Sequence, residues 1–466
     1  MDRQLKTMGK DSIRIAGGQG FYGDSPMAAI AIAREKAADY IVHDALAELT
    51  LSILQKDKMR DPNLGYARDI EFAAKSLYPI ALKNGIKIVT NSGGLNPEKA
   101  AQKVAEILGA QGVTGVKIAA ITGDNFIDRL DEVQQQGNNL AHLDSGEPFS
   151  SVEYQPTHAN VYTGARSVVE ALSQGADIIL AGRVADPCLT LGILAHHFGW
   201  DLDGDLDKLA SGIAVGHLLE CGGQASGGNA YSEWPMDYKL SNLGYPIAEV
   251  SEDGSAVFTK LKSQGGKMSR NTLREQLVYE IHDPANYLTP DVTVDLTAVS
   301  IEDVGDNQVS FSGVKGKPKP EKLKMTIGLM EGYLSEQFFF MSWPYAYKKA
   351  LKMVEAVKEI WEGLGIPIDR MEHQFIGLNG IHGAAIDIDE SQVEDMNEVG
   401  VRLCIKHKDA KTGKLAMQSI VCLGLNGPPG IISKPGWGKP STAMLSLWPT
   451  LVERDLIEEK VEIINS

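Results

Sequence analysis

The stretch GHLLECGGQASGG, residues 216–228, stands where the pattern of the chain changes. Short β-branched runs alternate with helical patterns before it, and this alternation fades after it. If VGHLLE forms the last turns of a helix, His217 and Glu220 lie three residues apart on one face, and Cys221 opens the following loop. The glycines of that loop allow a ligand to approach the backbone closely. A glycine-terminated helix with a buried structural cysteine is the alternative, and the sequence leaves both interpretations open.

The half before this stretch is typical of βαβ units. Its runs of high β propensity are residues 12–16, 39–43, 86–90, 116–121 and 177–182. Helical patterns separate them at residues 26–36, 44–56, 97–108 and 164–173. This alternation predicts an α/β fold with a mostly parallel sheet in an N-terminal lobe, residues 1–228.

The half after it predicts an α+β lobe with a mainly antiparallel sheet, residues 229–466. A hairpin is expected at residues 248–260, and further strands between 292 and 332. A helix is expected at 345–364. Two more strands, 401–409 and 416–424, are expected about a turn at Thr412 and Gly413, with Cys404 and Cys422 in the core.

Small or polar residues follow each strand of the N-terminal lobe. The carboxyl ends of parallel strands meet at one edge of a sheet, so these loops should converge on one crevice. They are residues 17–24, 44–48, 91–94, 122–125 and 183–186. Asp124 and Asp186 are candidate general bases there, and Arg183 is a candidate clamp for a substrate carboxylate. Capping of the following helices is the alternative role of such residues.

The candidate site combines these loops with the 216–228 stretch. Its candidate catalytic residues are Glu220, Asp186, His217, Cys221 and Asp124. Its candidate substrate-binding groups are Arg183, Gly18, Gln19, Gly20, Asn91, Gly93, Gly94, Gly123, Gly222, Gly223 and Gln224. Backbone N–H groups of the glycines would stabilise an enolate-like oxyanion, and Asp186 or Glu220 would move the proton, with His217 as the alternative shuttle. Cys221 is either a nucleophile or a merely buried thiol.

A GxGxxG pattern at Gly18, Gly20 and Gly23 follows the first strand. However, Asp24, Ser25 and Pro26 favour a helix start, which leaves Gly23 outside the helix, and Asp24 would repel a pyrophosphate. No cofactor and no metal site are therefore predicted. A metal or nucleotide cofactor is not excluded, and a nicotinamide-dependent oxidoreductase is kept as a further alternative.

Composition excludes some partners. The formal net charge of −16 argues against nucleic acid, and no apolar run is long enough to span a membrane. The N-terminal stretch lacks a signal peptide pattern, so we expect a cytoplasmic protein with reduced cysteines. One basic tract could attract an anionic small molecule, or it could be a solvated connection between strands; its lysines are Lys315, Lys317, Lys319, Lys322 and Lys324.

Eight longer motifs carry a family resemblance. They are IRIAGGQGFYGD at Ile13, DPNLGY at Asp61, IKIVTNSGG at Ile86, AAITGD at Ala119, GRVADP at Gly182, GHLLECGGQASGG at Gly216, GYPIAEVSEDGSAVFTK at Gly244 and EQLVYEIHDPANYLTPDV at Glu275. Through them nearly the whole chain resembles the acyclic terpene utilisation family, AtuA-like proteins catalogued as a domain of unknown function. The resemblance implies a part in bacterial catabolism of citronellol, geraniol and related branched acids.

The resemblance also implies a partner. Longer members of the family carry an extra C-terminal domain, which a small companion protein supplies for others, and this chain ends at Ser466 without room for it. We expect an enzyme of lyase or hydratase type that acts on a small branched carboxylate or its acyl-CoA ester. The alternative is a non-catalytic ligand-binding or scaffold subunit that works with the companion or with a carboxylase. A homo-oligomer is left open.

Overall fold

The computed structural model describes residues 11–433, 438 and 441–466, and this part of the chain forms two compact units. The first unit comprises the described residues up to 152, residues 157–327 and residues 448–466. The second comprises residues 153–156 and the described residues between 328 and 447. Residues 1–10, part of the stretch on which the expected cytoplasmic location rests, lie outside the described residues.

A ten-stranded sheet forms the centre of the first unit. Its middle is parallel, in the order β1 (Ser12–Gln19), β2 (Tyr40–His43), β3 (Lys87–Thr90), β6 (Ile178–Ala181) and β4 (Lys117–Thr122). These are the five strands predicted from the β-branched runs. The α/β class and the parallel sheet of the N-terminal half are therefore confirmed.

Antiparallel strands extend this sheet at both edges. Beyond β1 lie β7 (Ile247–Ser251), β8 (Ala256–Thr259), β12 (Gln308–Ser312) and β11 (Ser300–Gly305). At the other edge β19 (Lys460–Asn465) pairs with β4. The predicted hairpin at 248–260 is confirmed as β7 and β8. The complete sheet is mixed, and residues on both sides of position 228 contribute to it.

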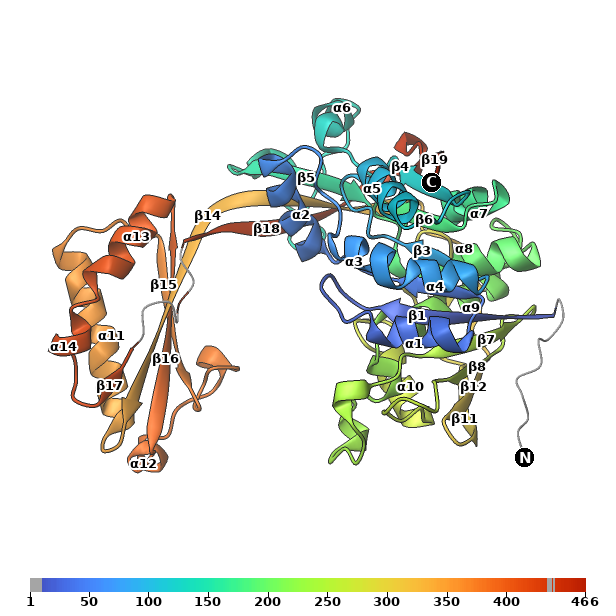
Figure 1. The fold of residues 1–466 in the computed structure, drawn as a ribbon. Helices are drawn as coiled ribbons and strands as arrows, with labels where there is room; N and C mark the ends of the chain where they lie inside the picture. Colours follow the sequence, from blue (N-terminus) through green and yellow to red (C-terminus); the bar gives the residue numbers. More distant parts are fainter. Residues whose placement is uncertain (1–10, 434–437, 439–440) are drawn as a thin grey trace. The chain divides into compact units, whose positions relative to one another are not determined.

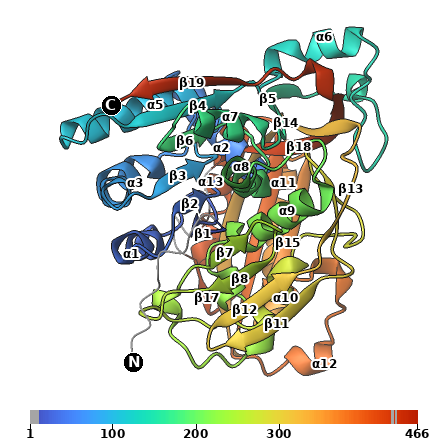
Figure 2. The ribbon, with the colours of Figure 1, turned by 90° about the vertical axis from the view of Figure 1, so that its right-hand side faces the viewer.

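Helices cover both faces of the parallel strands (Figures 1 and 2). One face is packed by α1 (Met27–Glu35), α3 (Asp69–Ser76), α4 (Tyr78–Lys83) and α5 (Pro97–Ala110). The other is packed by α7 (Arg166–Ser173), α8 (Asp186–Phe198) and α9 (Leu206–Glu220). Residues 209–219 of α9 are all buried, as expected of a helix that is apolar around most of its circumference. The predicted helix end at Glu220 is confirmed, with Cys221 as the C-cap.

Shorter elements complete this unit. They are α2 (Glu48–Arg60), α6 (Leu130–Gln135), α10 (Arg270–Leu277) and a three-stranded antiparallel sheet of β13 (Lys315–Lys317), β10 (Thr293–Asp295) and β9 (Tyr287–Leu288). Further strands are therefore present between 292 and 332, as predicted.

The second unit contains an antiparallel sheet in the order β15 (Arg370–Ile376), β16 (Glu398–His407), β14 (Lys322–Ser342) and β17 (Ile431–Ile432). Two further strands, β5 (Gln155–Val161) and β18 (Thr442–Glu453), also pair with β14. The helix predicted at 345–364 is α11 (Ala346–Gly363), whose Met353 and Trp361 are buried in the core of this unit. The mainly antiparallel sheet is confirmed.

The strand predicted at 416–424 is wrong, because this segment is helical. It lies in α13 (Ala410–Ser419) and α14 (Leu423–Asn426), while α12 (Glu390–Val393) precedes β16. The carboxylate of Asp409 accepts hydrogen bonds from the N–H groups of Lys411 (2.9 Å) and Thr412 (3.0 Å), so it caps the helix start and overrides the local β propensity. Cys422 is consequently exposed and not in the core, while Cys404 lies on β16 and is half-buried.

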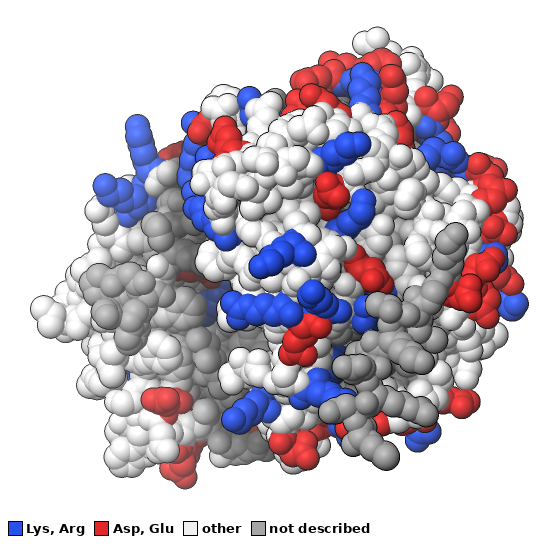
Figure 3. Space-filling model, turned by 45° about the vertical axis from the view of Figure 1, so that its right-hand side comes forward, with Lys and Arg blue, Asp and Glu red and all other residues white. Residues whose placement is uncertain are grey.

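Charged groups of both signs occupy the surface. Figure 3 shows lysine and arginine side chains interspersed with acidic ones on the face that it draws. Within the basic tract, Lys315 pairs with Asp207 at 2.9 Å, and Lys319 pairs with Asp203 at 2.7 Å. No helix in the described part of the chain is both long enough and apolar enough to cross a bilayer.

Candidate functional site

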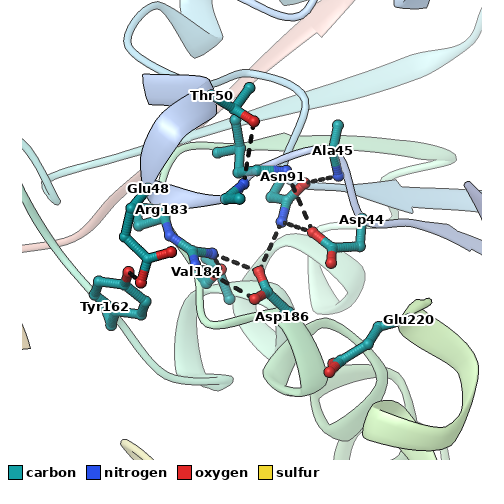
Figure 4. A network of polar contacts seen from close by, with 12 residues as sticks. Asp44, Ala45, Glu48, Thr50, Asn91, Tyr162, Arg183, Val184, Asp186 and Glu220 are labelled. Carbon is teal, nitrogen blue, oxygen red and sulfur yellow. Dashed lines mark hydrogen bonds and ion pairs between the residues drawn. The ribbon is translucent and has the colours of Figure 1, made fainter. Parts of the chain in front are cut away.

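The loops that follow β2, β3, β4 and β6 meet at the carboxyl edge of the parallel sheet (Figure 4). Asn91, directly after β3, joins them. Its Oδ1 accepts the N–H of Ala45 at 2.7 Å, and its Nδ2 donates to Asp44 Oδ1 at 2.7 Å and to Asp186 Oδ1 at 3.1 Å. The amide therefore fixes two carboxylates from different loops beside each other.

Arg183 and Asp186 form a buried ion pair within one loop. The guanidinium of Arg183 is 2% exposed and donates to both carboxylate oxygens of Asp186, with Nη2 3.3 Å from Oδ2. It also stacks over the ring of Tyr162, 4.1 Å from the centroid. This guanidinium is committed to Asp186, because a planar fork that binds one carboxylate in a bidentate manner has few donors left for another.

Asp124 holds the loop that presents this pair. Its Oδ2 accepts the backbone N–H of Arg183 at 3.0 Å and the side-chain amide of Asn160 at 2.6 Å. Burial raises the pKa of Asp124, although these donors oppose the effect. A side chain on Gly182 would collide with this carboxylate, so Asp124 is packed tightly under the loop.

A second group of charges flanks Arg183. Glu48, the first residue of α2, accepts a hydrogen bond from the Tyr162 hydroxyl and one from Lys324 Nζ at 2.9 Å. Burial by itself would raise the pKa of Glu48, but Lys324 and Arg183 outweigh it and lower the pKa to about 2. Glu48 is therefore ionised throughout the physiological range.

His217 and Glu220 form a different kind of pair at the end of α9. His217 Nδ1 lies 2.9 Å from Glu220 Oε1, and His217 Nε2 lies 3.0 Å from the backbone oxygen of Gln276. A backbone carbonyl can only accept, so Nε2 carries a proton. A second proton is then shared between Nδ1 and the carboxylate. This pair can store and release a proton.

Acidic groups crowd the space beside Asp186. Burial and the carboxylates of Asp186 and Glu220 raise the pKa of Asp44 well above its ordinary value. Burial also raises the pKa of Glu220, although His217 opposes the effect. Figure 4 shows that Asp44, Asp186 and Glu220 point into one region. The second oxygen of Glu220, Oε2, is buried and has no hydrogen-bond partner among the described residues.

Cys221 lies next to this pair but is a poor nucleophile. Burial, followed by the charge of Glu220, raises the pKa of the Cys221 thiol. The reactive thiolate is therefore scarce at neutral pH. Such an environment is typical of a structural cysteine.

A cavity of about 370 Å³ opens beside Asp186. Its wall is mostly apolar and is formed by Leu143, Tyr162, Ala185, Asp186, Pro187, Tyr287, Leu288, Thr289, Pro290, Pro320, Lys322, Leu323, Lys324 and Leu451. Tyr287 connects the cavity with the proton pair, since its ring centroid lies 5.8 Å from that of His217. Burial and the carboxylates of Glu220 and Asp186 raise the pKa of Tyr287, so its hydroxyl stays a donor.

The glycine loop after β1 is occupied by the protein's own carboxylates. Gly20 N–H donates to Asp24 Oδ2 at 2.9 Å, and Gly23 N–H donates to Asp69 Oδ2 at 2.8 Å. The side-chain amide of Gln19 also donates to Asp69. The N–H groups of Gly20 and Gly23 and the side-chain amide of Gln19 therefore already bind carboxylates of the chain. As predicted, Gly23 precedes α1.

The other predicted glycines are sites of close packing. A Cβ on any of Gly18, Gly20, Gly93, Gly94, Gly123 and Gly223 would lie within 2.6 Å of another atom. Gly222 has a φ of +57°, which favours glycine. Gln224 donates its backbone N–H to the Cys221 carbonyl at 3.1 Å. An additional role of these loops in binding a substrate oxyanion stays a prediction.

Several residues of the cluster were not among the predicted site residues. Asp44 and Glu48 lie in a loop that was expected to face the crevice, so the pattern after β2 could have identified them. Lys324 belongs to the basic tract and Tyr287 to the motif at Glu275, but neither signal placed these residues beside the crevice, and Tyr162 comes from a segment without a recognisable local signal. In the described part of the chain, no group of three or more His, Cys, Asp or Glu residues is arranged to hold a metal ion.

The fold and the cluster together define an α/β protein with buried acid–base groups at the carboxyl edge of a parallel sheet, beside an apolar cavity. Comparison with known families is specific. Residues 13–463 match the family model described as acyclic terpene utilisation family protein AtuA, and the chain belongs to this family. Membership implies a part in acyclic terpene utilisation. No curated protein and no solved structure matches the chain.

Proposed function

We propose that the protein is a hydratase or lyase that acts on a branched unsaturated carboxylate or its acyl-CoA ester. The observation that carries this proposal is the position of Asp186. It lines an apolar cavity, is paired with a permanent cation, and has two acids of raised pKa close to it. Neighbouring groups that differ in proton affinity are what acid–base catalysis at neutral pH requires.

The cavity suits a short branched chain. Leucine, proline and alanine side chains form most of its wall, and its volume lies at the lower end of the range for small-molecule sites. Lys322 and Lys324 are each 42% exposed in their side chains and stand at the same wall. Both are paired with acids of the chain, Lys322 with Glu453 at 2.7 Å and Lys324 with Glu48 at 2.9 Å, so a substrate anion would have to share these ammonium groups.

The proposed chemistry is addition of water across a double bond conjugated to the carbonyl. Asp186 accepts a proton from water, whose oxygen bonds to the β-carbon. The resulting enolate takes a proton at the α-carbon from the His217–Glu220 pair, and the Tyr287 hydroxyl donates to the enolate oxygen. The proton returns from Asp186 to the pair to complete the cycle, and the reverse direction is the lyase reaction.

The test is a turnover assay with purified full-length protein. Branched 2-enoyl-CoA esters and the corresponding free acids are offered, and loss of the conjugated enoyl absorbance is followed. Asp186→Asn should reduce turnover by about a thousandfold, whereas Asp203→Asn, which removes an exposed acid paired with Arg166 and Lys319, should leave it unchanged. Saturable binding of an ester without turnover across the panel would overturn the hydratase and support the scaffold alternative.

A further inference from the structure

A second, smaller cavity lies at the carboxyl ends of β1 and β2 and shares no lining residue with the larger one. Its volume is about 160 Å³. Its wall is formed by Gly18, Gln19, Gly23, Asp24, Pro26, His43, Asp69, Phe72 and Ala73. It occupies the place where the sequence predicted an anion site, but its lining contains two carboxylates and no lysine or arginine.

Two buried polar atoms of this lining are without a hydrogen-bond partner within the described ranges of the chain. They are Nε2 of His43, a residue that is 2% exposed, and Oδ1 of Asp69. Burial lowers the pKa of His43 to about 4, so the imidazole is neutral at physiological pH. A neutral ring nitrogen and a carboxylate oxygen can both accept hydrogen bonds from one ligand.

The other carboxylate is already satisfied. Both oxygens of Asp24 lie 2.7 Å from the Tyr245 hydroxyl, and Oδ2 also accepts the N–H of Gly20. Asp24 therefore adds negative charge to the cavity, but both of its carboxylate oxygens already accept hydrogen bonds from the chain. The unpaired oxygen of Asp69 is therefore the anchor, because its second oxygen accepts from Gly23 and Gln19.

These features exclude an anion and select a cation that carries N–H donors. Alkali cations prefer oxygen ligands, whereas one of the two free atoms here is an imidazole nitrogen. Apart from Gln19, whose amide donates to Asp69, the remaining wall is apolar, and Phe72, which is 54% exposed, can cover a cation or a short hydrocarbon stem.

The geometry points to a binding site for a small primary ammonium group at this second cavity, with Asp69 and His43 as its hydrogen-bond acceptors and Phe72 as an apolar wall. The site is separate from the proposed hydratase chemistry, and either can fail without the other.

The test is calorimetric titration of the full-length protein with methylammonium chloride, with tetramethylammonium chloride as the matched cation that lacks N–H donors. Methylammonium should bind saturably and tetramethylammonium should not. Asp69→Asn keeps an oxygen for Gly23 and Gln19 but removes the charge, and it should weaken methylammonium binding by about tenfold or more. Glu98→Gln, at an exposed position on α5, is the matched control and should bind as the wild type does.

Two further variants test the site independently, in case Asp69→Asn does not fold. His43→Leu removes the ring nitrogen at similar volume and should also weaken methylammonium binding. Phe72→Ala, at an exposed position, should reduce the affinity for n-propylammonium more than that for methylammonium. The site is disproved if methylammonium binds no better than tetramethylammonium, or if folded Asp69→Asn binds it as tightly as Glu98→Gln does.

Discussion

Two buried ion pairs with the same spacing behave differently in this molecule. Arg183 and Asp186 stand three residues apart, and so do His217 and Glu220. In both pairs the cation is almost fully buried, at 2% and 4% side-chain exposure. The guanidinium is a permanent charge, whereas the imidazole can give up its proton. The first pair therefore fixes a carboxylate, and the second pair holds a proton that can move.

The difference between the guanidinium and the imidazole separates the roles of the two pairs at the carboxyl edge of the sheet. Spacing and burial alone make the pairs look interchangeable. The identity of the cation decides that Asp186 is held in one position by Arg183, and that the His217–Glu220 pair is suited to deliver a proton.

The largest effect on turnover and stability is expected from breaking the Arg183–Asp186 pair. Asp186→Asn should reduce kcat/KM for a branched enoyl substrate by about a thousandfold, because a general base is lost. It should also lower the free energy of unfolding by about 3 kcal/mol, since Arg183 stays buried without its anion. Turnover and urea denaturation measure the two effects separately.

Asp203→Asn is the matched control for this prediction. It breaks two exposed pairs, that of Asp203 with Arg166 at 3.0 Å and that with Lys319 at 2.7 Å, so the free energy of unfolding should change by about 1 kcal/mol or less. Equal losses of stability in the two variants would contradict the assigned role of burial at Arg183.

Breaking the His217–Glu220 pair should give a smaller effect, on catalysis alone. Glu220→Gln keeps an oxygen that can accept from His217, but it cannot supply a proton. We expect kcat to fall by about a hundredfold while the urea midpoint stays near that of the wild type. A loss of stability without a loss of kcat would assign Glu220 a structural role.

Glu459 extends the comparison to a third buried acid. Its carboxylate accepts hydrogen bonds from hydroxyl groups, whereas Asp186 and Glu220 are each paired with a basic side chain. Glu459 accepts from Ser167 Oγ at 2.7 Å, and burial raises its pKa to about 7. The folded state therefore binds an extra proton between about pH 4.5 and 7, and stability falls as the pH rises through this window. Glu459→Gln should remove that slope, so that between pH 4 and pH 8 the variant gains roughly 3 kcal/mol of stability relative to the wild type. Parallel pH–stability curves for the two proteins would refute this.

The smallest effect on turnover is expected from substitution of Cys221, which lies beside the His217–Glu220 pair. Cys221→Ser should retain turnover within about a factor of three, because the thiol is protonated and takes no part in the proposed steps. Alkylation of the wild type at neutral pH should likewise be slow. A loss comparable with that of Glu220→Gln would restore Cys221 as a nucleophile.

Much of the parallel core could be predicted because its signals are local. The β-branched runs mark β1, β2, β3, β4 and β6, and sheet topology alone predicts that the loops after them converge. That argument correctly brought Asp186, Arg183 and Asn91 together. The pair of His217 and Glu220 followed from helical spacing.

The remainder depends on contacts between distant parts of the chain. β19 joins the sheet beside β4 although more than 300 residues separate them, as the bond from Val116 N–H to Ser466 Oγ illustrates. Tyr287 and Lys324 reach the cavity from segments after residue 228. The pattern of the glycine loop gave no sign that Asp69 would accept hydrogen bonds from Gly23 and Gln19. The strand expected at 416–424 is wrong because this segment lies in α13, whose start is capped by Asp409, and in α14.

The central claim is that Asp186 and the His217–Glu220 pair move protons to and from the α-carbon of a branched acyl substrate. Its most direct test is incubation of a branched 2-enoyl-CoA ester with the protein in D2O, followed by mass spectrometry of the products. We predict one deuterium on the α-carbon of the hydrated product with the wild type, and formation of this deuterated product about a thousandfold more slowly with Asp186→Asn and about a hundredfold more slowly with Glu220→Gln. Wild-type incorporation in both variants, or no incorporation by the wild type from any branched ester or acid, would contradict the account.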